Sequence, residues 1–162
     1  MREVISDTSP LQYLFQIGLL DLLNKLYAKV IVPEAVASEI KVGLASRVML
    51  PELTSLSWIR IREASQRALL PIAPGLGPGE REALALAVEA PGSLVLLDDG
   101  LARRHARLLK VKFTGTLGVL LKAKSLGHLA SITPVMDRLD GLGFRLDTKT
   151  RAAILEIAKE SE

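Results

Sequence analysis

Short apolar runs alternate with amphipathic segments along most of the chain. Five short runs rich in leucine or β-branched residues predict strands, at residues 3–6, 29–32, 58–62, 94–97 and 111–114. Apolar residues recur at helical spacing between and after these runs, which predicts helices over 11–17, 19–27, 33–43, 80–90, 100–109, 117–127, 132–143 and 147–160. Strands that alternate with helices predict an α/β fold, in which a mainly parallel central sheet carries helices on both faces in three layers.

Capping residues, glycines and prolines predict where several helices begin and end. Ser9 and Thr133, each followed by a proline, are interpreted as N-caps. Gly43 is expected to end the third helix. Residues 44–57 fit a further helix less clearly, and the proline- and glycine-rich stretch 71–79 predicts a loop.

Composition narrows the class of protein. A chain of 162 residues with 49% hydrophobic residues fits one folded domain with a sizeable core. The absence of cysteine excludes disulfides and thiolate metal sites. No signal-like segment and no apolar run of about 20 residues is present, so we expect a soluble cytoplasmic protein. The net charge of +3 permits a polyanionic partner without requiring one.

Carboxylates gather at the predicted strand ends and in the helices that follow. Asp7 comes directly after the first strand, and Asp98 and Asp99 come directly after the fourth. Glu39 and Glu80 lie in helices of the same α/β pattern. Ligands of such folds bind beyond the carboxyl ends of the strands. Because clustered carboxylates repel one another, a fold that gathers them usually holds a cation, and an oxygen-only site suits Mg²⁺ or Mn²⁺.

Each of these carboxylates also has a plain structural interpretation when it is taken alone. Asp7 could cap the next helix, and Glu39 could be a solvated helix residue. Glu80 could complement the positive end of its helix. Asp98 or Asp99 could cap the helix at 100–109, and Asp99 is the better candidate for that cap because it lies one position further along.

Four segments resemble the sequence motifs of PIN-domain proteins. The opening "VISDTSPLQYLFQIGLLDLL" is similar to their first strand, which ends in Asp followed by Thr or Ser. "VPEAVASEI", "GEREALALA" and "LVLLDD" resemble their second, third and fourth acidic elements. The order and spacing of all four agree over about residues 3–127. "FTGTLGVLLKAKSLG" is also similar to a prokaryotic subgroup related to VapC toxins.

The resemblance implies a metal-dependent ribonuclease, often a homodimer and often the toxin of a toxin–antitoxin pair. Asp7, Glu39, Glu80 and Asp98 match its catalytic, metal-binding positions, with Asp99 and Glu82 as less certain members. Counting back along the alanine-rich helix favours Glu80 over Glu82, which lies roughly 200° around the helix from it. Glu at this position departs from the family's usual Asp.

The resemblance also divides the chain. Residues 1–127 form a PIN-like α/β domain, and residues 128–162 form a C-terminal helical extension packed on it. The segment 47–74 is longer than in a minimal toxin, and the extension could serve dimerisation or partner binding.

An RNA substrate would need polar and basic groups beside the acidic site. Thr8, Ser9, Thr114 and Thr116 could bind a phosphate or a metal-bound water, although Ser9 is better explained as a helix cap and the two later threonines as turn or cap residues. Arg103, Arg107 and Lys110 share a helical spacing and could contact backbone phosphates. Aromatic residues make up only 4% of the chain, so base-stacking platforms are scarce.

Two other classes of protein compete with this interpretation. Strand-end aspartates also occur in phosphoryl-transfer domains of the receiver or haloacid-dehalogenase type, but Ser9 stands where those need a second Asp. The other alternative keeps the PIN fold and makes the protein a module that binds nucleic acid or a partner, with weak or no nuclease activity. A stabilising effect of Mn²⁺ on the folded state would separate an active site from a binding module.

Overall fold

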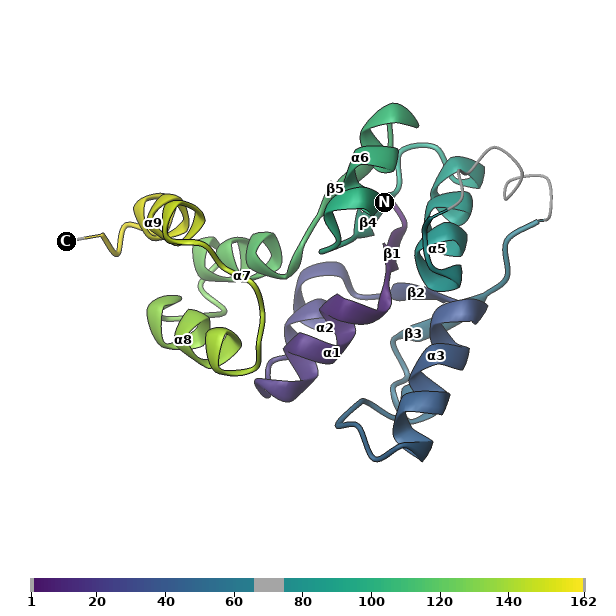
Figure 1. Ribbon diagram of the computed structural model, residues 1–162, viewed down its shortest axis with the longest axis horizontal. Coiled ribbons are helices and arrows are strands. Elements are labelled where there is room, and N and C mark those ends of the chain that lie inside the picture. Colours follow the sequence, from purple (N-terminus) through teal and green to yellow (C-terminus); the bar gives the residue numbers. More distant parts are fainter. Residues whose placement is uncertain (1, 66–74, 162) are drawn as a thin grey trace.

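The strands form from short buried runs of Val, Ile and Leu and build one parallel sheet. The computed structural model describes residues 2–65 and 75–161. The sheet consists of β1 (Val4–Ser6), β2 (Val30–Pro33), β3 (Ile59–Arg62), β4 (Leu94–Leu96) and β5 (Lys112–Thr114). The strand order is β3-β2-β1-β4-β5, with β1 at the centre (Figure 1). From β1 the chain first adds strands on one side of the sheet (β2, β3) and then on the other (β4, β5). Ligands of open α/β sheets bind beyond the carboxyl ends of the strands at such a switch point.

Alternating side chains of the strands supply two separate cores, one on each face of the sheet. Val4, Val32 and Leu96 belong to the first core, and Ile5 and Val95 belong to the second. The first core includes side chains from α1 (Thr8–Gln16), α2 (Asp21–Tyr27) and α7 (Thr116–Ser125). The second is built mainly with α5 (Pro78–Glu89) and α6 (Gly100–Leu108). The predicted three-layer α/β/α fold is therefore confirmed.

Helix α3 (Glu34–Ala45) joins the two layers of helices at one side of the sheet, because it packs against both α1 and α5. It continues past Gly43, so the predicted stop at that glycine is wrong. A methyl group on Gly43 would lie 2.4 Å from Leu50 Cδ1, so this glycine serves close packing. The helix ends at Ala45, just before Arg47 adopts a positive φ of 63°.

Two further expectations about local structure are corrected. After α3 ends at Ala45, the 3₁₀ turn η1 (Leu53–Ser55) is the only helical element up to residue 57, so the prediction of a further helix over 44–57 is wrong. Helix α1 begins at Thr8, with Asp7 at the N-cap position, so Ser9 is not the cap. Part of the predicted loop at 71–79 lies outside the described residues.

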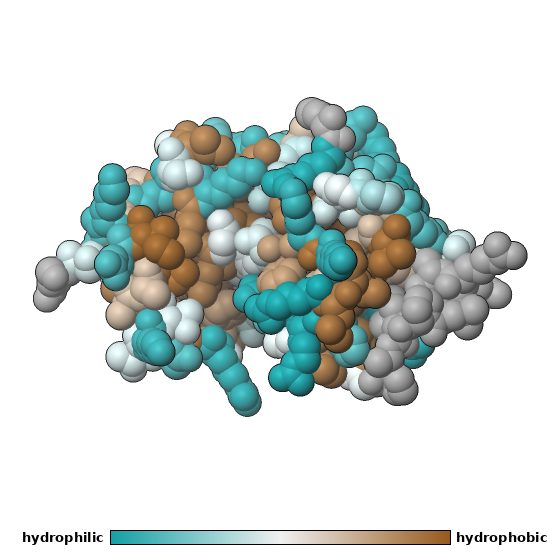
Figure 2. Space-filling view, turned by 90° about the horizontal axis from the view of Figure 1, so that it is seen from above, coloured by the Kyte–Doolittle hydropathy of each residue, from teal (hydrophilic) through white to brown (hydrophobic). Residues whose placement is uncertain are grey.

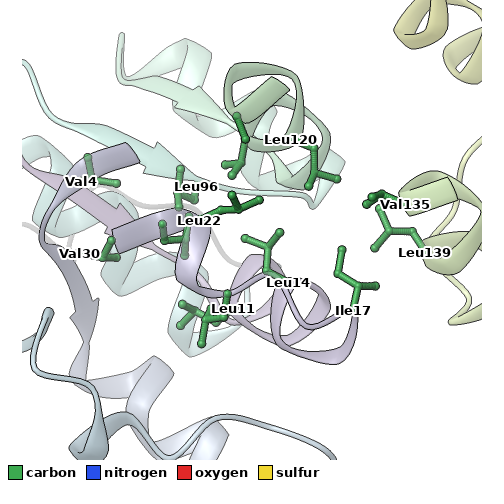
Figure 3. Packing of buried hydrophobic residues seen from close by; sticks show 14 of the residues in the cluster. Val4, Leu11, Leu14, Ile17, Leu22, Val30, Leu96, Leu120, Val135 and Leu139 are labelled. Atoms are coloured by element: carbon green, nitrogen blue, oxygen red, sulfur yellow. The ribbon is translucent and has the colours of Figure 1, made fainter. Parts of the chain in front are cut away.

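The C-terminal helices α8 (Thr133–Gly141) and α9 (Thr148–Ile157) continue the first core. Val135 and Leu139 of α8 point toward Ile17, the residue at the C-cap of α1 (Figure 3). Both residues are buried in the same cluster as the strand residues of the sheet. The two helices are thus anchored to the α/β part by apolar burial, which is the main stabilising term in folding.

Glu160 caps α8 from the far end of the chain. Its carboxylate accepts the backbone N–H groups of Ile132 and Thr133 and the hydroxyls of Ser131 and Thr133. The Lys124 ammonium lies 2.5 Å from Glu160 Oε2. Thr133 therefore does not cap α8, as its side chain donates to Glu160 instead. The bond from Lys124, followed by those from the α8 amides, holds the pKa of Glu160 well below its usual value of 4.5.

We expect Glu160→Ala to lower the free energy of unfolding by about 2 kcal/mol, because it leaves the amides of Ile132 and Thr133 without their acceptor and removes the ion pair with Lys124. Since the folded-state pKa is depressed, this contribution is present above pH 4.5 and is lost as the pH falls. Urea unfolding at pH 7 measures it. The exposed Glu156→Ala is the matched control, and equal losses in both variants would contradict the capping role.

The surface carries scattered apolar side chains. Hydrophobic and hydrophilic residues are interspersed on the face shown in Figure 2. The large apolar side chains that are more than half exposed come from different parts of the chain: Val42, Met49, Leu108, Leu126 and Ile157. Among the residues that the structure describes, no helix is both long and apolar enough to cross a membrane.

Candidate active site

Asp7 lies at the carboxyl end of the central strand, in a nearly water-free position. Its side chain is 5% exposed, and its backbone N–H donates to Leu96 O of the neighbouring strand. It occupies the N-cap position of α1, but its side chain makes no capping hydrogen bond, so the predicted cap role is not met. Burial, together with the charges of other carboxylates, raises the pKa of Asp7 to about 7, although the Thr8 amide opposes this.

Glu39 reaches the same region from the middle of α3. Its Oε2 accepts the Thr8 hydroxyl at 2.6 Å, and its Oε1 accepts the Gly79 backbone N–H at 2.9 Å. A methyl group on Gly79 would lie 2.8 Å from Glu39 Oε1 and 3.0 Å from Val36, so a side chain there would displace the Glu39 carboxylate. The first turns of α1 and α5 therefore hold Glu39 in place.

Asp98 follows β4 and is held by the first residue of α7. Its Oδ1 accepts the Thr116 backbone N–H at 2.8 Å, and its Oδ2 accepts the Thr116 hydroxyl at 2.7 Å. Burial raises the pKa of Asp98, while the two Thr116 bonds and the Arg103 charge oppose the rise. Thr116 is itself completely buried. Thr116 is thus a positioning group for Asp98, a role that neither of its predicted interpretations, phosphate or water ligand and cap or turn residue, includes.

Asp99 caps the next helix and also faces the acidic cluster. Its Oδ2 accepts the Ala102 N–H at 2.9 Å, which confirms the predicted cap of α6. Its charge nevertheless raises the pKa of both Asp7 and Glu80. Glu80 lies in the first turn of α5, and its pKa is raised to about 7 by burial first, then by Asp7, Asp99 and Glu39. These mutual effects place Asp7, Glu39, Glu80, Asp98 and Asp99 around one region of the strand ends.

Glu82 points elsewhere, and its two acceptor bonds explain why. Its Oε1 accepts the Ala35 N–H in the first turn of α3 at 2.7 Å, and its Oε2 accepts the Ala64 N–H at 3.1 Å. The side chain is buried, and it ties α5 to the positive end of α3. The structure thus separates the two candidates of the third element: Glu80 belongs to the acidic cluster, and Glu82 holds the helix that carries Glu39.

The cluster offers the oxygen donors that a hard cation prefers, but its carboxylates do not yet converge on one point. Within residues 2–65 and 75–161, no three Asp, Glu or His side chains already stand in a metal-ligand arrangement. Hydrogen bonds from Thr8, Gly79 and Thr116 hold two of the carboxylates instead. All candidate donors are carboxylate oxygens, and burial and the neighbouring carboxylates disfavour the ionised forms of Asp7 and Glu80. This set fits Mg²⁺ or Mn²⁺, whose charge would relieve that repulsion.

The other candidate residues for substrate contact lie on α1, β5 and α6 and after the end of α6. Ser9 lies in the first turn of α1, and a methyl group on Gly118 would lie 1.9 Å from Thr114 Oγ1, so that hydroxyl faces α7. Arg103 and Arg107 both lie on α6. Lys110 lies beyond the end of α6 with a left-handed φ of 57°, so the helical spacing that grouped it with the two arginines is wrong.

Surface grooves do not by themselves mark the site. A groove of 690 Å³ between α3 and the edge strand β3 is lined by residues such as Ile40, Leu53 and Ile61, and no residue of the acidic cluster lines it. A second groove of 540 Å³ includes Glu39 and Pro78 and borders the acidic cluster. The charge arrangement and the strand topology, rather than groove volume, therefore locate the candidate site.

Comparisons with known proteins agree with this geometry. No curated protein matches the sequence. A family model described as a PIN domain matches residues 3–160, which includes α8 and α9 as well as the sheet. PIN domains are generally nucleases. With this match over nearly the whole chain and a parallel sheet that gathers acidic residues at its carboxyl edge, the protein belongs to the PIN-domain family.

Proposed function

We propose that this protein is a metal-dependent endoribonuclease that hydrolyses RNA phosphodiester bonds. The observation that supports this most is the desolvated acidic cluster at the ends of β1 and β4, in which Asp7 and Glu80 have pKa values of about 7. Carboxylates so placed are costly unless a cation compensates their charge. The PIN-domain match makes a nuclease the natural use for such a site.

Asp7, Glu39, Glu80 and Asp98 would hold one or two Mg²⁺ or Mn²⁺ ions. When bound, such ions lower the pKa of a water and polarise a phosphodiester. The residues of the chain supply position rather than proton transfer. Thr8 and Gly79 orient Glu39.

Thr116 makes the matching contribution on the other side of the site, because it fixes both oxygens of Asp98. Asp99 contributes negative charge while it caps α6. We place it as a neighbour of the ligands rather than as a ligand.

Basic residues beside the cluster support RNA as the substrate. Arg103 on α6 donates to Leu97 O, directly before Asp98, and Arg107 lies one turn further along the same helix; both would contact backbone phosphates. Lys110 lies just before β5, whose Lys112 pairs with Leu94 at the other end of β4, so we do not place it beside the cluster. The resemblance to VapC toxins supports two further proposals, namely a role as the toxin of a toxin–antitoxin pair and a homodimeric state.

A cleavage assay tests the activity. Purified protein with Mn²⁺ or Mg²⁺ is expected to cut single-stranded RNA internally, and excess EDTA is expected to stop the reaction. A single-stranded DNA of the same sequence serves as the comparison substrate. Cleavage that persists in EDTA, or no cleavage of structured and unstructured RNA with either metal, would contradict the proposal.

One observation favours a second candidate, a PIN-fold module that binds nucleic acid or a partner without cutting it. Glu39 and Asp98 are already satisfied by hydrogen bonds, and the carboxylates of the described residues do not stand in a ready ligand arrangement. RNA binding without any effect of Mn²⁺ on thermal stability would favour this module over the enzyme.

A further inference from the structure

Arg103 is a basic residue that the fold holds close to Asp98. Its Nε–H donates to Leu97 O, the backbone carbonyl directly before Asp98, at 2.8 Å. This bond fixes the guanidinium beside the end of β4. Its charge is among the groups that lower the pKa of Asp98. Arg103 is only partly exposed, whereas its neighbour Arg104 is exposed.

Gly115 allows this approach. A methyl group at this residue would lie 2.0 Å from Arg103 Nη2, 2.7 Å from Asp98 Oδ1 and 3.2 Å from Leu97 O. The guanidinium nitrogen and the carboxylate oxygen therefore converge on the same point of backbone. The Nη side of Arg103 thus faces the acidic cluster, while its Nε is used to hold it there.

Phe113 holds a second guanidinium beside the first. The Arg103 Cζ atom lies 5.5 Å from the centre of the Phe113 ring, and the Arg107 Cζ atom lies 5.1 Å from it. None of the salt bridges found among the described residues involves either arginine. Two like charges on one ring repel each other, so an anion that contacts both would relieve that repulsion.

The spacing of this arginine pair suits two successive phosphates of a nucleic acid strand rather than one isolated anion. Arg103 and Arg107 are four residues apart on α6, which corresponds to about 6 Å along the helix axis. Only Arg103 also reaches the segment of Asp98. A nucleic acid strand that entered the acidic cluster could therefore place one phosphate at each arginine.

We propose that Arg103 is a catalytic residue that contacts the scissile phosphate of single-stranded RNA, and that Arg107 contacts a neighbouring phosphate only to bind the strand. This proposal rests on the proposed ribonuclease function. A fixed guanidinium next to the reacting phosphate stabilises the charge that develops on its oxygens in the transition state. Arg107 lies one helical turn beyond Arg103, so it adds affinity for the RNA backbone without stabilising the charge that develops on the scissile phosphate.

The experiment compares Arg103→Ala and Arg107→Ala with Arg104→Ala as the matched control on the same helix. With Mn²⁺, Arg103→Ala is expected to lower kcat at least about 100-fold, the effect of removing one donor to a developing charge. Arg107→Ala is expected to raise KM several-fold, to keep kcat within about threefold, and to reduce the salt slope of RNA binding by about 1. Arg104→Ala is expected to leave all of these values unchanged.

A structural role of Arg103 would give a different set of results. Added guanidinium is expected to restore part of the Arg103→Ala rate, and the Mn²⁺-induced rise in Tm is expected to stay as in wild type. Loss of the rate together with loss of the Mn²⁺ effect and no rescue would show that Arg103 only fastens α6 to β4. A kcat for Arg103→Ala equal to that of wild type would also overturn the proposal.

RNA binding separates this proposal from the proposed function. Kd for single-stranded RNA is measured by fluorescence anisotropy with Ca²⁺ in place of Mn²⁺. If wild type cuts no RNA, the ribonuclease function fails. A Kd for Arg103→Ala about threefold or more weaker than that of wild type would then still support the phosphate contact, and an unchanged Kd would overturn it.

Discussion

The Asp7→Asn protein is expected to be more stable than wild type in EDTA at pH 8, and to lose its metal-dependent RNA cleavage. Burial and the neighbouring carboxylates raise the pKa of Asp7 from 3.8 to about 7 in the folded state. Above pH 7 the folded protein must keep this carboxylate ionised at a cost. Asparagine has nearly the same shape and no charge, so it removes the cost while it also removes the proposed ligand.

The pH dependence has a definite sign. The folded state binds more protons at Asp7 than the unfolded state between pH 3.8 and about 7, so wild type loses stability as the pH rises through this range. The gain from Asp7→Asn should therefore be largest at pH 8 and should shrink toward pH 5. We expect it to reach about 2 kcal/mol at pH 8, or roughly 4 to 8 °C in Tm.

Thermal unfolding in EDTA at pH 5 and pH 8 measures this difference, and the RNA cleavage assay with Mn²⁺ measures the activity. Asp140→Asn, at an exposed position of α8, is the matched control and should change neither. If Asp7→Asn cut RNA as fast as wild type, Asp7 would have no role in catalysis. If it were less stable than wild type at pH 8, the carboxylate would have a structural partner instead.

Glu80 and Glu82, two residues apart on α5, are expected to respond in opposite ways. Glu82→Ala leaves the Ala35 and Ala64 amides without their acceptor, which should cost about 3 kcal/mol of stability, or roughly 6 to 12 °C in Tm. Glu80→Gln removes a carboxylate whose ionised form is disfavoured by burial and by the neighbouring carboxylates, so the Tm in EDTA should stay the same or rise. It should lower the rate of RNA cleavage about 100-fold, as loss of a transition-state interaction does.

The same two variants test the assignment through metal binding. Mn²⁺ should still raise the Tm of Glu82→Ala, although that Tm starts from a lower value. It should raise the Tm of Glu80→Gln much less. The reverse pattern, in which Glu82→Ala loses the Mn²⁺ effect and Glu80→Gln keeps it, would transfer the third acidic position to Glu82.

Much of the fold could be predicted because local patterns and tertiary structure agree. Runs such as "LVLL" are short, apolar and bounded by turn residues, which favours a buried parallel strand, and helical spacing marks the segments between them. The turns of the chain were less predictable. Gly43 looks like a helix stop, but its lack of a side chain makes room for Leu50, which only the folded structure brings there.

The acidic site was predictable in outline and not in detail. Strand ends placed Asp7 and Asp98, since the parallel order brings the ends of β1 and β4 together. The groups that hold the carboxylates come from distant segments, so the sequence around each carboxylate does not predict them. Thr116 lies 18 residues after Asp98, and the Gly79 amide lies 40 residues after Glu39.

Asp99 shows why a single role per residue can mislead. The pattern of a carboxylate before a helix correctly predicts its bond to Ala102. Its electrostatic effect on Asp7 and Glu80 depends on the approach of α5 to the strand ends, which no local pattern contains. Glu160 is a similar case, because it caps a helix that begins 27 residues before it.

The central claim is that the carboxylates at the ends of β1 and β4 form a divalent-cation site. Thermal unfolding of wild type and Asp7→Asn over a series of Mn²⁺ concentrations at pH 8 tests it most directly. We predict that the Tm of wild type rises steadily with the Mn²⁺ concentration, while that of Asp7→Asn stays nearly constant. At a free Mn²⁺ concentration of 100 times Kd, the free energy of unfolding of wild type should be higher by about 2.7 kcal/mol. Equal responses of the two proteins, or no response of wild type, would contradict the claim.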